Sequence, residues 1–434
     1  MEASSMNKPK VLLIECKSSA INYIEDCRKM GYEPVLMEMY VPEEWISYTR
    51  SILYRNFRNM GETDIPEIID APKSYEETLK MVQEMHPAAV IPGQDIAVEL
   101  ATRLAHDLQL PCNDPSLIKT FRYKDLCQEA LERHGVRSVR GKIVSSLNEA
   151  LEFFRESGYK RVIVKPNSGV GTRGVYVCEN EDQITEAFNI NASGINYTTL
   201  ASEDVLIQEY IDGVEYVINT VSYHGVHKVT GAFVYKKSII PGTGPIYDTV
   251  ETIPMNSPEV MELKDYMFRV LDAVGLEIGP VHSELKIDGN GPVLIESNFR
   301  PCGFAMRGSW VQKVFGNRET DIALLSYLDP ETFLADKRDI LACGKYQGIL
   351  KTLRIPYDLK VKRPLFHEKF KDLPGYEYSQ DKGENTVYKR TVDLITDGGI
   401  IAFASPDYET ISRSVDIIRN LEQNDIESLF ELEK

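Results

Sequence analysis

The stretch RVIVKPNSGVGTRG (Arg161–Gly174) combines a short strand pattern with a glycine-rich loop. Its first half is rich in β-branched residues and ends in Lys165 and Pro166, which is typical of a strand that stops at a cation. Its second half has three glycines within six residues, and Val175–Cys178 follows as another strand. The pattern predicts a hairpin whose loop exposes backbone amides beside Lys165, a combination that can bind phosphate. It is not a Walker A loop, because it lacks a GK[ST] triplet and a strand follows instead of a helix.

The charge around this hairpin differs from that of the whole chain. The 434 residues include 49 Lys and Arg against 66 Asp and Glu, a net charge of −17, which argues against coating of nucleic acid or of an anionic membrane. Between Gly158 and Cys178, however, no acidic residue occurs, whereas Lys160, Arg161, Lys165 and Arg173 do. A basic stretch inside an acidic chain favours a phosphate site over a plain hairpin turn.

Two glutamates are expected to face each other further along the chain. Glu284 and Glu296 lie on consecutive predicted strands joined by Asp288-Gly289-Asn290-Gly291, so they can stand opposite each other in a hairpin. Asn298 follows Glu296 by two residues and therefore projects from the same face. Such oxygen ligands bind Mg²⁺ (or Mn²⁺) together with substrate phosphates. The alternative is a surface ion pair between one glutamate and a neighbouring lysine or arginine.

Two further motifs flank these residues. The segment QEYIDGVE (Gln208–Glu215) predicts a strand that ends, turns at Gly213 and resumes, where backbone groups can bind an adenine edge and Glu215 the ribose hydroxyls. Taken alone, it looks like any hairpin. Arg300 lies in a second acid-free stretch, Ser297–Arg318, and could either stabilise charge on a transferring phosphoryl group or form an ion pair with a glutamate.

In this order, the motifs resemble those of the ATP-grasp superfamily. The resemblance covers about Leu117–Arg318 and begins with a lysine in the helix before the small lobe. It implies an ATP site and a role for each residue. The phosphates would be bound by Lys124, Lys165 and the loop residues Ser168, Gly169 and Gly171, and the adenine would be bound by Gln208, Glu209, Tyr210 and Ile211. Glu215 would bind the ribose, and Glu284, Glu296 and Asn298 would bind Mg²⁺. Arg300 and Lys165 would be the catalytic residues.

Within the superfamily, IESNFRPCG (Ile295–Gly303) and the loop Pro241–Pro254 are most similar to the bacterial L-amino acid ligases, the group that contains bacilysin synthetase. This resemblance implies an ADP-forming ligase that activates the carboxylate of an L-amino acid as an acyl phosphate and joins it to an amine, that of a second amino acid, to form a dipeptide or amide. The chain departs from the common pattern at Phe299 and Phe304, which replace a proline and a glycine. The expected substrate residues are Glu251, for the α-ammonium group of the first amino acid, with Arg300, Phe304 and Arg307.

Other functions share these motifs. Another ATP-grasp carboxylate–amine or carboxylate–thiol ligase would differ only in its acceptor pocket, and a biotin-type carboxylase would need bicarbonate and a carrier lysine. A regulatory ATP-binding protein should have lost some of the lysines, metal ligands or Arg300. The expected cofactors are ATP and Mg²⁺, and the expected partners are a small carboxylate and an amine, without nucleic acid or membrane. The sequence leaves open whether the chain forms a homodimer.

The whole chain predicts an α/β and α+β protein of about three domains. Residues 1–115 alternate strands and helices, as in a parallel pre-ATP-grasp domain, and the first βα turn, Glu15–Ser19, has no glycine, which argues against a GxGxxG dinucleotide site. Residues 116–320 would form the ATP-grasp domain, with a small lobe at about 120–205 and the nucleotide and metal sheet at about 206–320, and residues 321–434 a C-terminal α+β lobe. Two local expectations are one helix over Leu117–Gly135 that carries Lys124, and a strand at Arg390–Ile395.

The cysteines and the apolar runs bear on location. Seven cysteines at wide spacing, without a CxxC pair, favour reduced thiols and a cytoplasmic protein. The only apolar run near the start, Val11–Ile14, is too short for a signal peptide, and no stretch approaches the roughly 18 apolar residues of a membrane span. Cys302, beside Arg300, is expected to pack in the interior.

Overall fold

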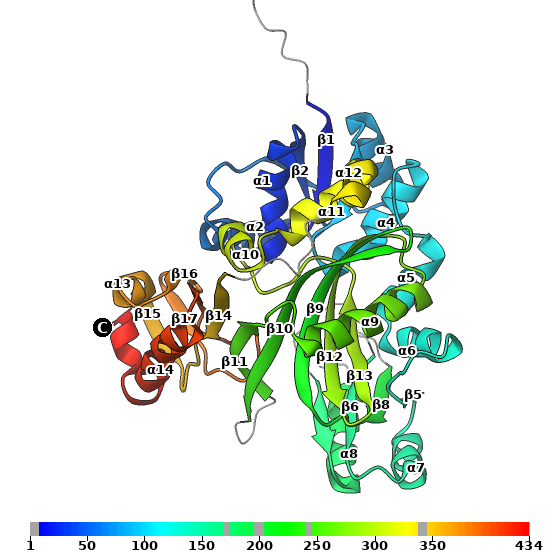
Figure 1. The fold of residues 1–434 in the computed structure, drawn as a ribbon, viewed down its shortest axis with the longest axis vertical. Helices are drawn as coiled ribbons and strands as arrows, with labels where there is room; N and C mark the ends of the chain where they lie inside the picture. Colours follow the sequence, from blue (N-terminus) through cyan, green and yellow to red (C-terminus); the bar gives the residue numbers. More distant parts are fainter. Residues whose placement is uncertain (1–7, 168–173, 194–203, 240–244, 337–344, 434) are drawn as a thin grey trace, which may run out of the picture.

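The computed structural model describes residues 8–167, 174–193, 204–239, 245–336 and 345–433 (Figure 1). Within these residues the strands form four sheets that differ in direction and in position along the chain. One sheet is parallel and belongs to the N-terminal part, whereas the others are antiparallel. The predicted combination of α/β and α+β architecture is therefore confirmed.

The N-terminal sheet has the strand order β3-β2-β1-β4, and its strands run parallel. Its strands are buried on both faces, as in Leu12 and Leu13, because helices cover each side. This confirms the expected parallel unit at the start of the chain. Its elements are β1 (Lys10–Ile14), α1 (Asn22–Lys29), β2 (Glu33–Glu38), α2 (Glu43–Met60), β3 (Glu67–Asp70), α3 (Tyr75–Met85), β4 (Ala89–Pro92) and α4 (Val98–Asp107), with 3₁₀ turns at Ser18–Ile21, Asp95–Ala97 and Pro115–Leu117.

A small antiparallel sheet of order β5-β8-β6-β7 carries the glycine-rich hairpin. As predicted, β6 pairs antiparallel with β7, and α8 packs on β6 beside α7. Helix α7 begins after the cap Ser146, whose side chain accepts from the backbone N–H of Glu149, and ends at Gly158 in the left-handed conformation. The elements are β5 (Gly141–Val144), α7 (Leu147–Ser157), β6 (Val162–Pro166), β7 (Tyr176–Cys178), α8 (Glu181–Ala192) and β8 (Val205–Glu209).

The expected single helix over Leu117–Gly135 is wrong. The segment forms two helices, α5 (Ile118–Arg122) and α6 (Lys124–Arg133), because Tyr123 between them is extended, with φ −102° and ψ 124°. Asn167, at the end of β6, accepts from the N–H of Asp125 at 3.3 Å and donates to its carboxylate at 2.8 Å. This long-range contact holds the start of α6 and puts Lys124 at its first turn.

The largest sheet is antiparallel and has the order β13-β12-β9-β10-β11-β14-β18-β16. Helix α9 packs against β9, β10 and β13, while α11 lies between this sheet and α1 of the N-terminal sheet (Figure 1). Trp310 is 1% exposed in the core, and its indole N–H donates to the carbonyl of Phe403 at 2.9 Å. The elements are β9 (Val214–Tyr223), β10 (Val226–Ile239), β11 (Pro245–Thr252), α9 (Pro258–Ala273), β12 (Ile278–Asp288), β13 (Gly291–Asn298), α10 (Gly308–Phe315), α11 (Glu319–Leu328), α12 (Pro330–Ala335), β14 (Gln347–Thr352), β16 (Tyr376–Gln380) and β18 (Ile400–Ser405).

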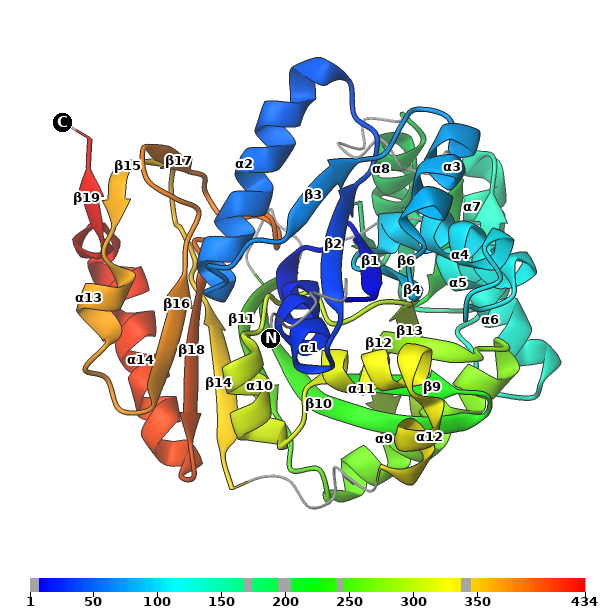
Figure 2. The same cartoon turned by 90° about the horizontal axis from the view of Figure 1, so that it is seen from above.

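The C-terminal lobe completes this sheet and adds a three-stranded sheet of order β17-β15-β19. Figure 2 shows this lobe at one end of the molecule and the small lobe with α7 at the other. Because the largest sheet contains strands from both sides of Thr320, the domain limits near Asp114 and Thr320 stay a prediction. The remaining elements are β15 (Leu359–Pro364), α13 (Phe366–Phe370), β17 (Thr386–Tyr388), α14 (Tyr408–Asn424), a 3₁₀ turn at Ile426–Leu429, and β19 (Phe430–Leu432).

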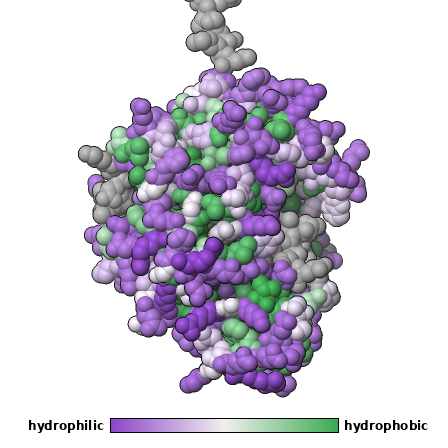
Figure 3. Space-filling model, turned by 90° about the vertical axis from the view of Figure 1, so that its right-hand side faces the viewer, coloured by the Kyte–Doolittle hydropathy of each residue, from purple (hydrophilic) through white to green (hydrophobic). Residues whose placement is uncertain are grey.

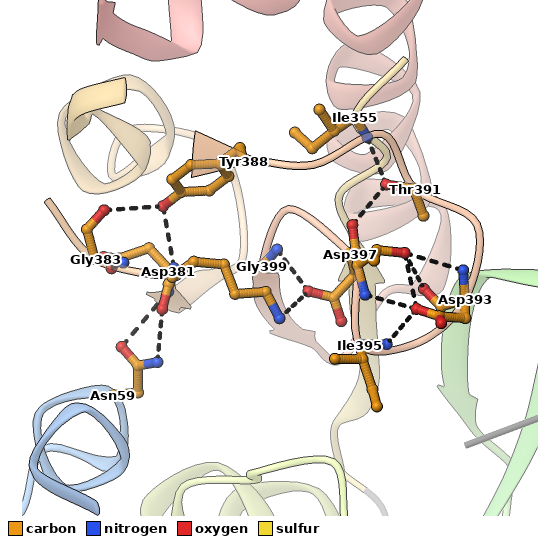
Figure 4. Close-up of polar contacts among 12 residues, drawn as sticks. Asn59, Ile355, Asp381, Gly383, Tyr388, Thr391, Asp393, Ile395, Asp397 and Gly399 are labelled. Atoms are coloured by element: carbon orange, nitrogen blue, oxygen red, sulfur yellow. Dashed lines mark hydrogen bonds and ion pairs between the residues drawn. The ribbon is translucent and has the colours of Figure 1, made fainter. Parts of the chain in front are cut away.

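The strand expected at Arg390–Ile395 is also wrong. The Asp393 carboxylate accepts from the backbone N–H groups of Ile395 at 3.0 Å and Thr396 at 2.8 Å, which closes a turn (Figure 4). Asp397 then accepts from the N–H of Gly399 at 2.9 Å. Aspartate competes for local backbone donors in this way, so the β-branched pattern did not produce a strand.

On the surface, hydrophilic residues cover most of the face seen in Figure 3, with hydrophobic residues in small separate patches. No helix in the described part of the chain is both long and apolar enough to cross a membrane.

Candidate functional site

The two predicted metal glutamates face each other. In the register of β12 and β13, Glu284 pairs with Glu296, and the register shifts directly after Glu284. Both side chains are about one fifth to one quarter exposed, at 21% and 24%. Asn298 is buried and pairs with His282. The structure thus brings two carboxylates and an amide oxygen to one end of the same hairpin.

Two lysines from different elements lie beside these carboxylates. The Lys124 Nζ, at the start of α6, is 3.3 Å from a carboxylate oxygen of Glu296. Lys165, at the end of β6, is 6% exposed. Burial, with the charge of Lys124 added, lowers the pKa of Lys165 to about 7. A polyphosphate beside both lysines would favour the charged form of Lys165, so the pair is arranged as an anion site would be.

A hinge separates the two sheets that meet here. Strand β8 ends at Glu209 in the small sheet and β9 begins at Val214 in the large one, so Gly213 joins two sheets and is not the turn of a simple hairpin. Gly213 has φ 128°, and a Cβ atom there would lie 2.2 Å from the carbonyl oxygen of Ile287. Only glycine fits this crossing.

The residues before Gly213 lie between the small sheet and β12. Lys286 donates to the carbonyl of Ile211 at 2.9 Å, and its ammonium lies 4.8 Å from the Tyr210 ring centre, while Arg161 lies 4.2 Å from that ring. Glu209 accepts from the backbone N–H of Arg140 at 2.8 Å. Gln208 is buried at the centre of the small sheet.

Lys237 is a site residue that the sequence analysis missed. Its Nζ lies 2.5 Å from a carboxylate oxygen of Glu215, the predicted ribose ligand, and 4.4 Å from the centre of the Tyr247 ring. Lys237 also acts on Glu284. Burial alone would raise the pKa of Glu284, but hydrogen bonding to His282 and the charge of Lys237 lower it to about 2. Glu284 is therefore ionised over the whole neutral range.

An aromatic cluster lies next to Lys237 and Glu215. Phe304, one of the predicted substrate residues, packs against Tyr235 and Tyr247 with ring centres 5.5 and 5.4 Å apart. The two tyrosines, on β10 and β11, are themselves 5.0 Å apart. Alternation along β10 places Tyr235 and Lys237 on one face, a period-two signal that could have identified both residues.

Arg300 is held by an acidic residue from the N-terminal part. Its guanidinium donates to one carboxylate oxygen of Asp95 at 2.9 Å, with a second nitrogen of the guanidinium 2.8 Å from the same oxygen. Arg300 is 9% exposed. The partners are 205 residues apart, so no local pattern could have revealed the contact.

The structure does not bring two of the predicted substrate residues to this cluster. Glu251 pairs with Val234, whereas Tyr235 pairs with Glu215, so Glu251 projects from the opposite face of the sheet. Its carboxylate accepts from the Tyr408 hydroxyl at 2.8 Å, and Lys236 lies 2.8 Å away.

Arg307 also points elsewhere, since its guanidinium donates to the carbonyl of Asn59 at 2.8 Å and covers the ring of Tyr378. Ser168, Gly169 and Gly171 lie outside the described residues.

Cys302 is buried, as expected. Its backbone N–H donates to Glu319 at 3.0 Å, and burial raises the pKa of Glu319 to about 7. Behind Cys302 lies a cavity of about 20 Å³, lined in part by Asn219 and Thr230. This volume holds about one water molecule, so the cavity is too small for a nucleotide or an amino acid.

The donor set fits a hard divalent cation that also takes ligands from phosphate. In the described part of the chain, no three His, Cys, Asp or Glu side chains converge on one metal position. Binding of Mg²⁺ here would therefore use the Glu284 and Glu296 carboxylates, the Asn298 amide oxygen and phosphate oxygens of the substrate.

Comparisons with known proteins agree with this geometry. Over 424 residues the chain is 24% identical to dapdiamide A synthase of Enterobacter agglomerans, with 96% of each chain covered. It is 29% identical over 257 residues to the carbamoyl phosphate synthase large chain of Thermotoga maritima, which is 54% of this chain but only 22% of that relative. The fold matches the L-amino acid ligase from Bacillus licheniformis with a TM-score of 0.74 at 15% identity, over 96% of this chain and 98% of the other. The family model for the ATP-grasp domain matches residues 159–307, the part that holds Lys165, the hinge, both glutamates and Arg300. Residues 159–307 of this chain are an ATP-grasp domain.

Proposed function

We propose that this protein is an ATP-dependent ligase that activates a carboxylate as an acyl phosphate and joins it to an amine, with release of ADP and phosphate. One observation carries the proposal. Two facing carboxylates, Glu284 and Glu296, lie beside the amines of Lys124 and Lys165 where two sheets meet, and all but Lys124 belong to the ATP-grasp domain. A nucleoside triphosphate would bring anionic phosphate oxygens to the two lysines, and its divalent cation would bring positive charge to the two carboxylates.

Each part of ATP has a group to receive it. Lys124 and Lys165 would bind the phosphates, together with Ser168, Gly169 and Gly171 of the glycine-rich segment. The Gln208–Ile211 segment would bind the adenine through its backbone, and Glu215 the ribose. Mg²⁺, when bound by Glu284, Glu296 and Asn298, would neutralise phosphate charge and align the γ-phosphate with the attacking carboxylate.

The proposed reaction has two chemical steps. The substrate carboxylate attacks the γ-phosphorus, the bond to the β–γ bridging oxygen breaks, and ADP leaves. The amine nitrogen then attacks the acyl carbon, phosphate leaves, and the amine loses a proton. Arg300 would stabilise the negative oxygens that develop in both steps. Lys165 would keep contact with the phosphoryl group during its transfer.

We propose L-amino acids as both substrates, and hence a dipeptide or a related amide as product. Support comes from the likeness to dapdiamide A synthase and to the L-amino acid ligase from Bacillus licheniformis. The cluster of Tyr235, Tyr247 and Phe304 beside Glu284 would form the wall that contacts the side chain of the activated amino acid. An aromatic wall favours apolar side chains.

The test is phosphate release from ATP by the purified protein, with and without single amino acids and pairs of amino acids. We expect release that depends on amino acids, together with an amide product seen by mass spectrometry. Stimulation by a carboxylate with a thiol would assign a different ligase, and stimulation by bicarbonate would assign a carboxylase. Nucleotide binding without any stimulated release would leave only the regulatory function.

A further inference from the structure

The loop that carries Arg300 has no regular structure of its own. Residues 299–307, between β13 and α10, contain neither helix nor strand. Ala305 has φ 49°, a left-handed conformation that is uncommon for a residue other than glycine. A loop of this kind keeps one shape only when surrounding groups hold it.

Glu319, Tyr378 and Gln380 hold part of this loop from the large sheet and α11. A second set of contacts comes from the N-terminal part of the chain. The Ser18 hydroxyl donates to the carbonyl of Gly303 and accepts from the N–H of Ala305 at 2.8 Å. Two neighbouring side chains continue the pattern. Ser19 accepts from the N–H of Met306 at 2.9 Å, and Asn22 donates to the carbonyl of Met306 and accepts from the N–H of Gly308, both at 2.9 Å.

Asp95 adds an ion pair to these contacts. It lies in the turn after β4 and binds the Arg300 guanidinium from the side, through Nε and Nη2 at 2.9 and 2.8 Å. The third guanidinium nitrogen, Nη1, donates to the carbonyl of Pro301 at 2.9 Å. Because Arg300 is nearly buried, this charge-assisted pair fixes both the position and the orientation of the guanidinium.

We infer that Asp95 is a positioning residue for Arg300, and that Ser18, Ser19 and Asn22 hold the loop in the shape that catalysis requires. This inference rests on the proposed function of Arg300. It gives the N-terminal sheet a part in the chemistry, because the groups proposed to bind ATP all lie outside it. A misplaced guanidinium would weaken stabilisation of the transition state while leaving nucleotide binding intact.

The first test is Asp95→Asn, which keeps the size of the side chain and removes its charge. We expect kcat for amino-acid-dependent phosphate release to fall at least about tenfold, since displacement of a catalytic group by about 1 Å can cost about 100-fold. The KM for ATP and the calorimetric affinity for Mg·ADP should stay within about twofold of wild type. Asp95→Glu, which restores the charge, should recover part of kcat.

The matched control is Asp70→Asn, which removes another N-terminal carboxylate paired with an arginine, Arg50, at 2.9 Å. It should leave kcat unchanged. A kcat for Asp95→Asn within twofold of wild type would overturn the inference. A fall in kcat accompanied by weaker nucleotide binding and a lower melting temperature would also overturn it, because it would indicate a structural role.

A crystal structure of the Asp95→Asn variant gives a readout that does not need activity. Arg300 should leave its present position, and an unmoved guanidinium would overturn the inference. If the wild-type protein released no phosphate with any substrate, the proposed function would fail, whereas this structural outcome would still decide whether Asp95 holds Arg300.

Discussion

Nucleotide binding is expected to be coupled to proton uptake by Lys165. Burial and the nearby Lys124 lower the pKa of this buried amine to about 7, from an ordinary value of 10.5. At pH 8.0 only roughly one tenth of the free protein therefore carries a protonated Lys165. Phosphate groups beside the amine favour its charged form and raise the pKa. Binding of Mg·ADP should then take up about 0.9 proton per site at pH 8.0 and only about 0.1 at pH 6.0.

Isothermal titration calorimetry measures this uptake directly. At a fixed pH, the slope of the observed enthalpy against the ionisation enthalpy of the buffer equals the number of protons bound. Lys165→Met should bring the slope at pH 8.0 close to zero, whereas the control Lys142→Met, at an exposed position on β5, should keep the wild-type slope. A wild-type slope near zero at pH 8.0 would refute the reasoning.

The same shift predicts how the stability of the free protein depends on pH. Between pH 7 and 10.5 the unfolded chain keeps the lysine proton that the folded chain has released. The unfolded state thus binds more protons, so the contribution of Lys165 to the free energy of unfolding rises with pH in this window. Below pH 7 the charged amine is buried at a cost. The gain in melting temperature of Lys165→Met over wild type should accordingly shrink as the pH rises from 7 to 10.

Three substitutions test the other parts of the site and the core. Glu296→Gln should abolish amino-acid-dependent phosphate release and leave the circular dichroism spectrum unchanged; near-wild-type turnover would contradict the proposed metal role. Gly213→Ala should lower the free energy of unfolding in urea by at least about 2 kcal/mol, because its Cβ would lie 2.2 Å from the carbonyl oxygen of Ile287, and an unchanged midpoint would show that the hinge can relax. The backbone N–H of Leu294 donates to the Tyr266 hydroxyl at 2.9 Å, so Tyr266→Phe removes its acceptor. The free energy of unfolding in urea should fall by about 1–3 kcal/mol, and an unchanged value would mean that a water replaces the hydroxyl.

Contacts between neighbours in the sequence were predictable. The pairing of Glu284 with Glu296 follows from two strand patterns and the short turn between them. Helix α7 is likewise limited by local groups in the structure, the cap Ser146 and the left-handed Gly158. In each case the deciding groups lie within about a dozen residues. Strand alternation, turn residues and helix caps act over this range, so the sequence carries the information locally.

Local patterns failed where a distant residue competed. The periodicity over Leu117–Gly135 is helical on both sides of Tyr123, but Asn167 holds the N-terminus of α6 and interrupts the helix. Glu251 shows a second limit. Strand alternation predicts which residues share a face of the sheet with Glu251, but not which elements pack against that face. In the structure α14 packs there, and its Tyr408 hydroxyl donates to the Glu251 carboxylate.

The sequence by itself determined the hairpins, the basic stretch around Lys165 and the carboxylate pair, because each depends on residues close together in the chain. Only the tertiary structure decided that Lys237 reaches Glu215 and that Asp95 holds Arg300. Both contacts join charged side chains from separate strands or separate sheets. The first contact depends on the register in which β9 and β10 pair. The second depends on how the N-terminal part packs against the large sheet, which hydrophobic burial across the whole molecule decides and no single motif records.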